Sequence, residues 1–476
     1  MKKLINIIII LALTVLMSCS EDFLNILPES SVTVDILYKT DKDFQDAVTG
    51  CYTALRSVYT DMYVYGDVRS DDAWHALGNN VTMNAIDAFS ERSSESIFAN
   101  SWRDCYLVIF RANAILQEIQ KFDETTIPNK ARHTAEARFL RALAYFNLVT
   151  TFGDVPKVTT VVSIEDAYKS GRAKVDVIYN EVIIPDLLAA ETGLSATYTG
   201  TNIGRATSGA AKSLCGKAYL YIKDFAKAEA KLAEVVSSNT YSLLPKYSDL
   251  FNYTINEHHK EYIFDIEFIA GGLGLGSHFT NSFIPKSTNA FADTYFNIKG
   301  GLGELNSPRI ELFNAFAKTD VRRDITIDTN KVFYKFIQIS TFTKKYITAV
   351  ASLNDSPVNW KVIRYADVLL MYAEALNENN KTTEALTQLN KIRVRVAMPI
   401  YSGLSKDQAR TAIYDERRFE LGMEGHRWFD LVRTGRALAL MSSKGMKSYN
   451  VVFPIPLREI QVINNPSIFP QNEGYD

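Results

Sequence analysis

The sequence has few cysteines, tryptophans and histidines, no excess of either charge, and only one strongly apolar segment. Its 476 residues include 4 Cys, 4 Trp and 6 His. The 52 basic and 54 acidic side chains give a formal net charge of −2, which argues against a nucleic-acid partner because such proteins usually carry a large basic excess. Hydrophobic residues make up 47% of the chain. That is enough for a large core and excludes the composition of a disordered protein.

Motifs for nucleotide, metal and hydrolase chemistry are also missing. GxxxxGKS/T, HExxH and GxSxG do not occur. The glycine run at 271–276 lacks the spacing of a dinucleotide-binding loop, and residues 277–280 after it are not expected to open a helix. His258 and His259 stand close to Glu261, but no third ligand follows at helical spacing, so we interpret them as a solvated turn. We therefore predict neither a cofactor nor a metal ion.

The single apolar segment lies at the amino terminus. Lys2 and Lys3 precede a run from Ile7 to Met17, which is too short to span a bilayer and suits a signal-peptide core. The run ends in LMSC, which looks like a bacterial lipoprotein cleavage site with Cys19 as the lipidated residue. An ordinary secretory signal with an incidental cysteine is the alternative. We expect a signal peptide at 1–18, a lipidated tether at 19–40, and a mature chain that is anchored to a membrane without spanning it.

Three cysteines remain once Cys19 is lipidated. Cys51, Cys105 and Cys215 are an odd number and form no CxxC or zinc-like spacing. Each lies in an apolar pattern typical of a helix. The sequence therefore predicts buried free thiols and a fold that does not depend on disulfides.

Helical periodicity dominates two regions of the chain. In both, apolar residues recur at steps of three and four. We expect an all-α fold, with a helical repeat scaffold at 41–240 and a last helical repeat with the C-terminal scaffold at 361–476. The expected helices cover 43–58, 102–119, 132–150, 175–188, 208–222 and 225–236 in the first region, and 362–377, 382–394 and 406–432 in the second.

Two of the expected helix pairs share an internal pattern. Both sets of residues follow steps of 3, 6, 3, 4 and 3, and a small residue is followed four places later by a bulky one. This pattern is typical of paired helices in tetratricopeptide repeats. Ordinary antiparallel helix pairs are the alternative. The two sets are Gly216, Tyr219, Phe225, Ala228, Leu232 and Val235, and Ala373, Leu376, Thr382, Ala385, Leu389 and Ile392.

The segment between the helical regions has a different character. Residues 261–268 alternate as a strand does, and glycines and prolines, including Pro285, Pro308 and Pro357, break up the rest. We predict a large irregular, loop-rich insertion at 241–360. Because binding residues concentrate on such loops, we expect the insertion to contribute to a ligand site.

Three carboxylates line one face of the last long helical range. Glu416, Glu420 and Glu424 are four residues apart, and paired carboxylates are what a glycosidase requires. They are interleaved with arginines, so we favour an internal ion-pair network over a catalytic site. The arginines are Arg417, Arg418, Arg427 and Arg433.

Several longer motifs carry a family resemblance that spans nearly the whole chain. Together they resemble the SusD/RagB family of Bacteroidetes outer-membrane lipoproteins. The matching motifs are RFLRALAYF at 138–146, FGDVP at 152–156, RATSGAAK at 205–212, VIRYADVLLMYAEA at 362–375, ERRFEL at 416–421, EGHRWFDLVR at 424–433, PIP at 454–456, NP at 465–466 and QNEGY at 471–475.

The resemblance implies a cell-surface lipoprotein of the outer membrane that binds oligosaccharides. Such a protein delivers its ligand to a SusC-type TonB-dependent transporter, and it is not an enzyme. Ser20, Glu21 and Asp22 also resemble the acidic export tag of surface lipoproteins. A RagB-like peptide-binding protein of the same transporter system is the main alternative, and a glycan-degrading enzyme is a weaker one.

Sugar binding requires flat aromatic faces beside amide or charged side chains. The resemblance places Trp102, Trp360 and Trp428 in the scaffold. Trp74 remains, in a polar loop where the family commonly places ligand contacts, and packing against that loop is its alternative role. We expect a shallow platform built from this loop and from aromatic residues of the insertion. The candidate ligand-binding residues are Trp74, Asn79, Asn80, Phe279, Phe291, Tyr295 and Phe296.

Overall fold

The computed structural model describes residues 37–76, 78, 80–255, 257–285, 289–300, 303–329 and 341–476, and the side chains of all of these except 289–292. The predicted signal peptide, Cys19 and most of the predicted tether lie outside these ranges. In the ranges that are described, every helix is too short or too polar to cross a membrane.

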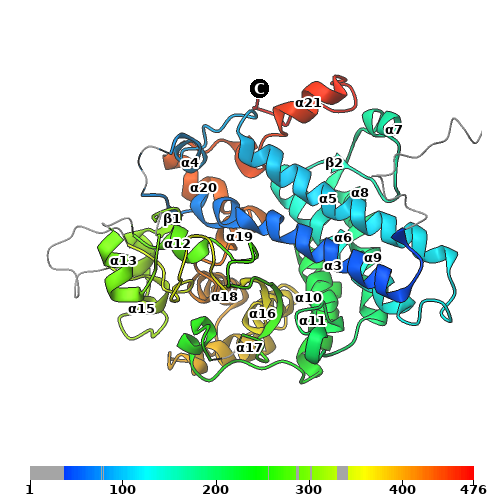
Figure 1. Ribbon diagram of the computed structural model, residues 1–476. Coiled ribbons are helices and arrows are strands. Elements are labelled where there is room, and N and C mark those ends of the chain that lie inside the picture. The colour runs from blue at the N-terminus through cyan, green and yellow to red at the C-terminus, as the bar shows by residue number, and fades with distance from the viewer. Residues whose placement is uncertain are drawn as a thin grey trace, which may run out of the picture.

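Helices form most of the described chain, which confirms the predicted all-α fold class (Figure 1). The helices of the first half are α3 (Asp41–Thr60), α4 (Val81–Asp87), α5 (Ser96–Glu118), α6 (Lys130–Phe152), α7 (Ile164–Tyr168), α8 (Val175–Ile178), α9 (Ile184–Gly193), α10 (Ser208–Tyr221) and α11 (Phe225–Ser237). Those of the second half are α12 (Phe279–Phe283), α13 (Asn289–Phe296), α14 (Ile310–Ala315), α15 (Arg323–Thr326), α16 (Tyr365–Glu378), α17 (Thr382–Arg395), α18 (Lys406–Glu420), α19 (Arg427–Arg433), α20 (Ala437–Met441) and α21 (Leu457–Ile463).

Strands are short and occur in antiparallel pairs. Strand β1 (Ala73–Trp74) pairs with β5 (Ser307–Pro308), and β2 (Val155–Pro156) pairs with β3 (Arg172–Ala173). Strand β4 (Tyr262–Ile266) pairs with β6 (Trp360–Arg364), so the two ends of the middle segment meet in one small sheet.

The helix α3 shows how the sequence directs local structure. Thr40 caps its first turn in a reciprocal capping box with Asp43, which satisfies otherwise unpaired backbone N–H groups. From Phe44 onward, apolar residues at steps of four and three, including Val48 and Leu55, form one buried face. This face packs against α5 and α6, and Figure 1 shows α3 and α5 lying side by side.

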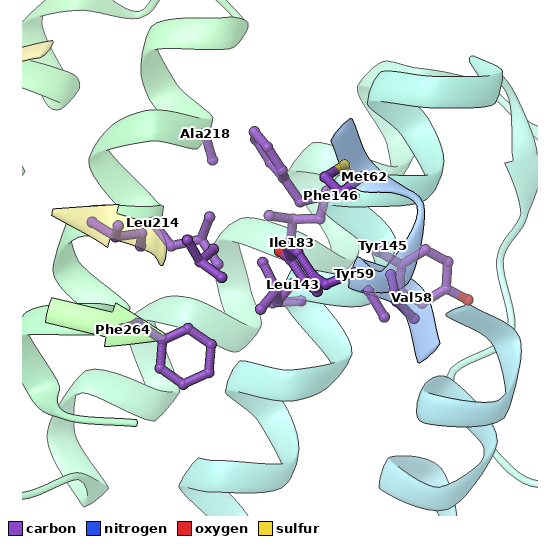
Figure 2. Close-up of a cluster of buried hydrophobic side chains, with 14 of the residues drawn as sticks. Val58, Tyr59, Met62, Leu143, Tyr145, Phe146, Ile183, Leu214, Ala218 and Phe264 are labelled. Atoms are coloured by element: carbon purple, nitrogen blue, oxygen red, sulfur yellow. The ribbon is translucent and has the colours of Figure 1, made fainter. Parts of the chain in front are cut away.

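The scaffold continues as a series of helices in which each packs on the next. Helix α6 contacts α9, α9 contacts α10, α10 contacts α11, α11 contacts α16, and α16 contacts α17 and α18. Figure 2 shows part of the resulting core, where Leu143 and Phe146 of α6 lie between side chains of α3 and α10. Phe264 of β4 joins the same buried cluster, so the small sheet packs on the helical scaffold.

The two helix pairs with the shared pattern are neighbours in space. They are α10–α11 and α16–α17, and they meet where α11 packs on α16. A Cβ atom at Gly216 would lie 2.6 Å from Cγ of Leu232, so glycine is what allows α10 and α11 to approach so closely. Ala373 and Leu389 are at the positions of the second pair that correspond to Gly216 and Leu232, and both are buried. The tetratricopeptide-like arrangement predicted for these pairs is confirmed.

Three local predictions were wrong. Residues 362–364 belong to β6, because pairing with β4 overrides their helical pattern. The range 406–432 is interrupted between α18 and α19, where Met423 and Gly425 have positive φ angles of 67° and 77°. The range 175–188 is helical as predicted, although α8 and α9 are joined there by a π-helical turn at Tyr179–Ile183. Finally, α12 opens directly after the glycine-rich segment, although only for five residues.

The cysteine prediction is confirmed for the described residues. Cys51, Cys105 and Cys215 are free and buried. Burial raises the pKa of the Cys51 thiol to about 12, so the thiol is protonated and unreactive at neutral pH.

The middle segment contains β4, β5 and the short helices α12–α15, joined by irregular stretches. Phe279 and Phe283 of α12 belong to the main core, whereas Ile284, Ile298 and Phe342 form a small core of their own. Residues of all three predicted ranges, 41–240, 241–360 and 361–476, belong to one core. The division of the chain into these three domains therefore remains a prediction.

The three carboxylates Glu416, Glu420 and Glu424 are buried in an ion-pair network. Glu416 binds Arg322 at 2.6 Å and Arg393 at 2.7 Å. Glu420 pairs with Arg322, Arg364 and Arg395. Glu424 binds Arg364 and Lys345, each at 2.7 Å. The network is confirmed, but its cations come mainly from other elements and not from the interleaved arginines.

We predict that Glu420→Ala strongly destabilises the fold. The substitution leaves three buried guanidinium groups without one of their partners, which costs about 3–5 kcal/mol. Thermal and chemical unfolding measure the loss. The matched control is Glu384→Ala on the exposed side of α17, for which a change within about 0.5 kcal/mol is expected. Equal stability of the two variants would contradict the network's role.

The same network predicts acid sensitivity. Burial by itself raises the pKa of Glu424, but Arg364 and Lys345 outweigh it and lower the pKa to about 2. Because the folded pKa lies below the unfolded one, this stabilisation is complete above the unfolded pKa of about 4.3 and is lost as pH falls toward 2. Urea unfolding at a series of pH values from 6 to 2 should show this fall, with a smaller fall in Glu424→Gln.

Candidate functional site

Trp74 is the exposed tryptophan of the chain. Its side chain is 38% exposed, whereas Trp102, Trp360 and Trp428 are each at most 4% exposed. The three buried tryptophans lie in α5, β6 and α19, as the scaffold interpretation expects. Trp74 lies in β1 opposite Ser307 of β5, so an exposed ring stands on a hydrogen-bonded strand and not on a free loop.

Two aspartates directly before β1 fix the strand to the C-terminal scaffold. Arg427 donates two hydrogen bonds to Asp71, at 2.7 and 2.8 Å. Arg418 donates to Asp72 at 2.7 Å. Burial by itself would raise the pKa of both carboxyls. At Asp71 the hydrogen bonds from Arg427 outweigh burial and lower the pKa, whereas at the more deeply buried Asp72 burial prevails.

Arg309 fixes the other side of the strand. Its backbone N–H donates to the carbonyl of Asp72 at 2.7 Å, and its Nε donates to the carbonyl of Ala73 at 3.0 Å. Its Nη2 binds both oxygens of Asp87 in α4 at 2.6 Å. The backbone beside Trp74 is therefore held by charged contacts from both sides, which pre-organises the exposed ring.

The polar loop after Trp74 has a structural task of its own. Asn80 caps α4 by accepting a hydrogen bond from the backbone N–H of Met83 at 3.1 Å. His75 is buried and its Nε2 lies 2.8 Å from Oδ1 of Asn84. Asn79 lies outside the described residues. The Oδ1 atom of Asn80 thus serves as a helix cap. The side chain as a whole is half-buried at the loop.

The aromatic candidates of the insertion fall into different environments. Phe279 was wrongly included, because it is fully buried and packs against Phe283, Tyr346 and Trp360, so it has no face to offer a ligand. Phe296 packs edge-on against Phe342. Tyr295, on α13, is 51% exposed. The side chain of Phe291 lies outside the described part of the chain.

The insertion reaches the Trp74 strand through its backbone. The N–H of Ala76 donates to the carbonyl of Glu304 at 2.9 Å, and the N–H of Glu304 donates to the carbonyl of Ile284 at 2.9 Å. These bonds and the β1–β5 pair place the Trp74 strand at the edge of the insertion. Figure 1 shows β1 next to α12 and α13.

Sequence reasoning missed the residues that support Trp74. It assigned Arg418 and Arg427 to the glutamates of their own segment, although they bind Asp71 and Asp72. The two adjacent aspartates before Trp74 were the sequence signal that could have pointed to these arginines. No sequence signal pointed to Arg309, because its role depends on the pairing of β1 with β5, and these two short strands lie far apart in sequence.

The acidic helix face does not offer a second, catalytic arrangement. Glu416, Glu420 and Glu424 are at most 3% exposed. Burial raises the pKa of Glu420, but Arg395, Arg364 and Arg322 outweigh it and hold this pKa far below its usual range. A general acid needs a raised pKa and access to substrate, and this carboxylate has neither.

Comparison with known proteins agrees with this architecture. Residues 22–220 match the family model described as starch-binding associating with outer membrane, and residues 320–451 match the model of the SusD family. The SusD-like protein P25 of Formosa agariphila is 28% identical, with 99% of this chain and all of that protein covered. A SusD-like protein of Bacteroides ovatus is 26% identical, covering 90% of this chain and 83% of that one.

Solved structures show the same fold. A laminarin binding SusD-like protein is 29% identical, with a TM-score of 0.80 over 92% of this chain and all of that chain. Surface glycan-binding protein A from Bacteroides fluxus, at 24% identity, shares the fold with a TM-score of 0.80 over 92% of this chain and all of its own. With both family models, the full-length relatives and these structures in agreement, the chain belongs to the SusD family.

Proposed function

We propose that the protein is a lipid-anchored glycan-binding protein of the cell surface, with Trp74 at the centre of its binding platform. The half-exposed ring of Trp74 on a rigidly held strand is the observation that carries this proposal. A flat, fixed aromatic ring loses little conformational entropy when a sugar stacks on it. The bound oligosaccharide passes to a SusC-type TonB-dependent transporter.

The surroundings of Trp74 suit a sugar chain. Tyr295 on the neighbouring insertion is a second exposed ring, and the amide nitrogen of Asn80 is a hydrogen-bonding group for hydroxyls, while Asn79 stays a candidate from the sequence alone. Phe291 and Phe296 are secondary candidates on the same helix. Since a 29% identical relative is described as laminarin binding, laminarin is the first glycan to test.

We predict that Trp74→Ala removes most glycan binding and leaves the fold intact. A shallow platform binds with micromolar to millimolar affinity, on the order of −4 to −8 kcal/mol. Loss of the ring should weaken binding to laminarin at least about tenfold, whereas stability should change by less than about 1 kcal/mol, as for a surface substitution. Calorimetry measures binding, and thermal unfolding measures stability.

Fluorescence provides a second readout of the same site. Because the other three tryptophans are buried, acrylamide should quench mainly Trp74 and a bound glycan should protect it. Phe110→Ala is the matched control, since this aromatic is 54% exposed on α5. If Trp74→Ala binds laminarin as the wild type does, or unfolds early, the platform lies elsewhere.

The same calorimetry distinguishes glycan binding from the alternative function, peptide binding. A RagB-like protein would bind members of a peptide panel through their backbones and show no response to a glycan panel. A glycan response that depends on Trp74 favours the platform. Hydrolysis of any glycan by the purified protein would instead favour an enzyme.

We predict that Cys19→Ala abolishes lipid attachment. Without the cysteine sulfur, no acyl chain can be attached, and membrane binding is lost because each buried methylene contributes about 0.8 kcal/mol. Metabolic labelling with palmitate followed by membrane fractionation measures this in cells. Cys51→Ala is the control and should remain labelled. Persistent labelling of Cys19→Ala would overturn the proposed anchor.

A further inference from the structure

A groove lies between α3 and β4, on residues that have no part in the Trp74 platform. Its volume is about 540 Å³, which is within the range of small-molecule sites. The α3–β4 groove is lined by residues of α3, of the loop before α10, and of β4 and its continuation. Those that matter for its chemistry are Tyr52, Arg56, Glu257, Asp265, Glu267 and Phe268.

Two carboxylates of the groove have buried oxygens without partners. Asp265 is only 8% exposed, and its Oδ1 has no hydrogen-bond partner among the described residues. Oε1 of Glu257 is also buried without a partner there. Buried polar atoms are rarely left unpaired, so each requires a donor that the described chain does not supply.

A third carboxylate adds to the negative charge. Glu267 accepts a hydrogen bond from Asn359 at 2.9 Å and lies 3.7 Å from Nδ1 of His258. The three carboxylates repel one another, and burial is the largest cause of the raised pKa of each; the pKa of Glu257 reaches about 7. An empty groove therefore holds these groups in an unfavourable environment.

The cations near the groove are engaged by other partners. Arg56 donates to the carbonyl of Leu275, and Arg205 donates to Glu136 and Asn202. Lys361 is the cross-strand neighbour of Asp265, and its charge partly offsets the raised pKa of all three carboxylates, but its Nζ donates to the Tyr253 hydroxyl and the Asn359 carbonyl. The unpaired oxygens of Asp265 and Glu257 therefore still lack a hydrogen-bond donor among the described residues, and a positively charged donor from outside would supply one.

The size and spacing of the site favour an organic cation over a metal ion. Among the described residues no three acidic, histidine or cysteine side chains come together closely enough to hold a metal. An ammonium group does not need three convergent carboxylates, because it can donate to one or two of them and direct its remaining N–H donors to water or hydroxyl groups.

We propose that the α3–β4 groove is a second ligand site, for an amino sugar whose ammonium group donates to the unpaired oxygens of Asp265 or Glu257, with Glu267 adding to the attraction for its charge. The rest of the groove matches a sugar ring. Tyr52 and Phe268 provide aromatic surface, and Thr49, Thr53 and Thr201 place hydroxyl groups along the edge. An amino sugar carries the charge, the hydroxyls and the flat C–H face that these residues would contact together.

Calorimetry with two matched oligosaccharides tests this proposal. A short glucosamine oligomer with free amino groups should bind, and the same oligomer with every amine acetylated should bind at least about tenfold more weakly, because acetylation removes the charge. Glu267→Gln should weaken binding of the free-amine oligomer about tenfold or more. Asp265→Asn should have the same effect, and thermal unfolding shows that each variant is folded.

The controls separate this site from the Trp74 platform. Glu384→Gln on α17 should bind the free-amine oligomer as the wild type does. Trp74→Ala should keep amine binding, and Glu267→Gln should keep laminarin binding, so either proposal can fail alone. The inference is overturned if both oligomers bind equally, if neither binds, if Glu267→Gln has no effect, or if a lysine-containing peptide binds as tightly as the sugar.

Discussion

The buried contacts of Arg364 hold together parts of the chain that are far apart in sequence. Arg364 ends β6, and its guanidinium group binds Glu261 beside β4, Glu420 at the end of α18 and Glu424 in the turn that follows. A charge in this position is stable only while all of its partners stay in place. The small sheet, α18 and the turn before α19 are therefore fixed relative to one another.

The same C-terminal segment determines where the candidate platform lies. Arg418 is two residues from Glu420, and Arg427 is three residues after Glu424. Their guanidinium groups form separate ion pairs with Asp72 and Asp71, next to Trp74. The N–H of Gly425 also donates to Asp67 at 2.9 Å. The exposed ring is thus positioned by the scaffold core and not by the polar loop that surrounds it.

The sequence predicted the features that depend on local periodicity. The helices α3, α6, α10, α11 and α17 begin and end within about two residues of their predicted ranges, because an amphipathic pattern and a cap act over a few residues. The pattern around Gly216 and Leu232 also predicted a close helix pair.

Features that depend on long-range pairing escaped prediction. Residues 362–364 form a strand because β4 lies beside them. Phe279 and Tyr295 are both aromatic residues of the irregular insertion, yet one is fully buried and the other half-exposed. Periodicity does not extend through a segment of short elements, so it cannot tell which ring faces the core. The family resemblance singled out Trp74 by placing the other three tryptophans in the scaffold, but it did not indicate the supporting arginines.

The contacts around Arg364 are buried ion pairs and not apolar contacts. This has a physical consequence for the binding surfaces. Apolar side chains of similar volume could stabilise the fold equally well. They are non-directional, however, and would allow neighbouring elements to shift. A guanidinium group that binds two or three carboxylates fixes direction as well as distance. Platforms that gain affinity from pre-organisation depend on such fixed directions. Trp74 follows Asp71 and Asp72, which Arg427 and Arg418 bind, and Asp265 lies on the strand that follows Glu261, which Arg364 binds, so both candidate sites lie within a few residues of an arginine–carboxylate pair.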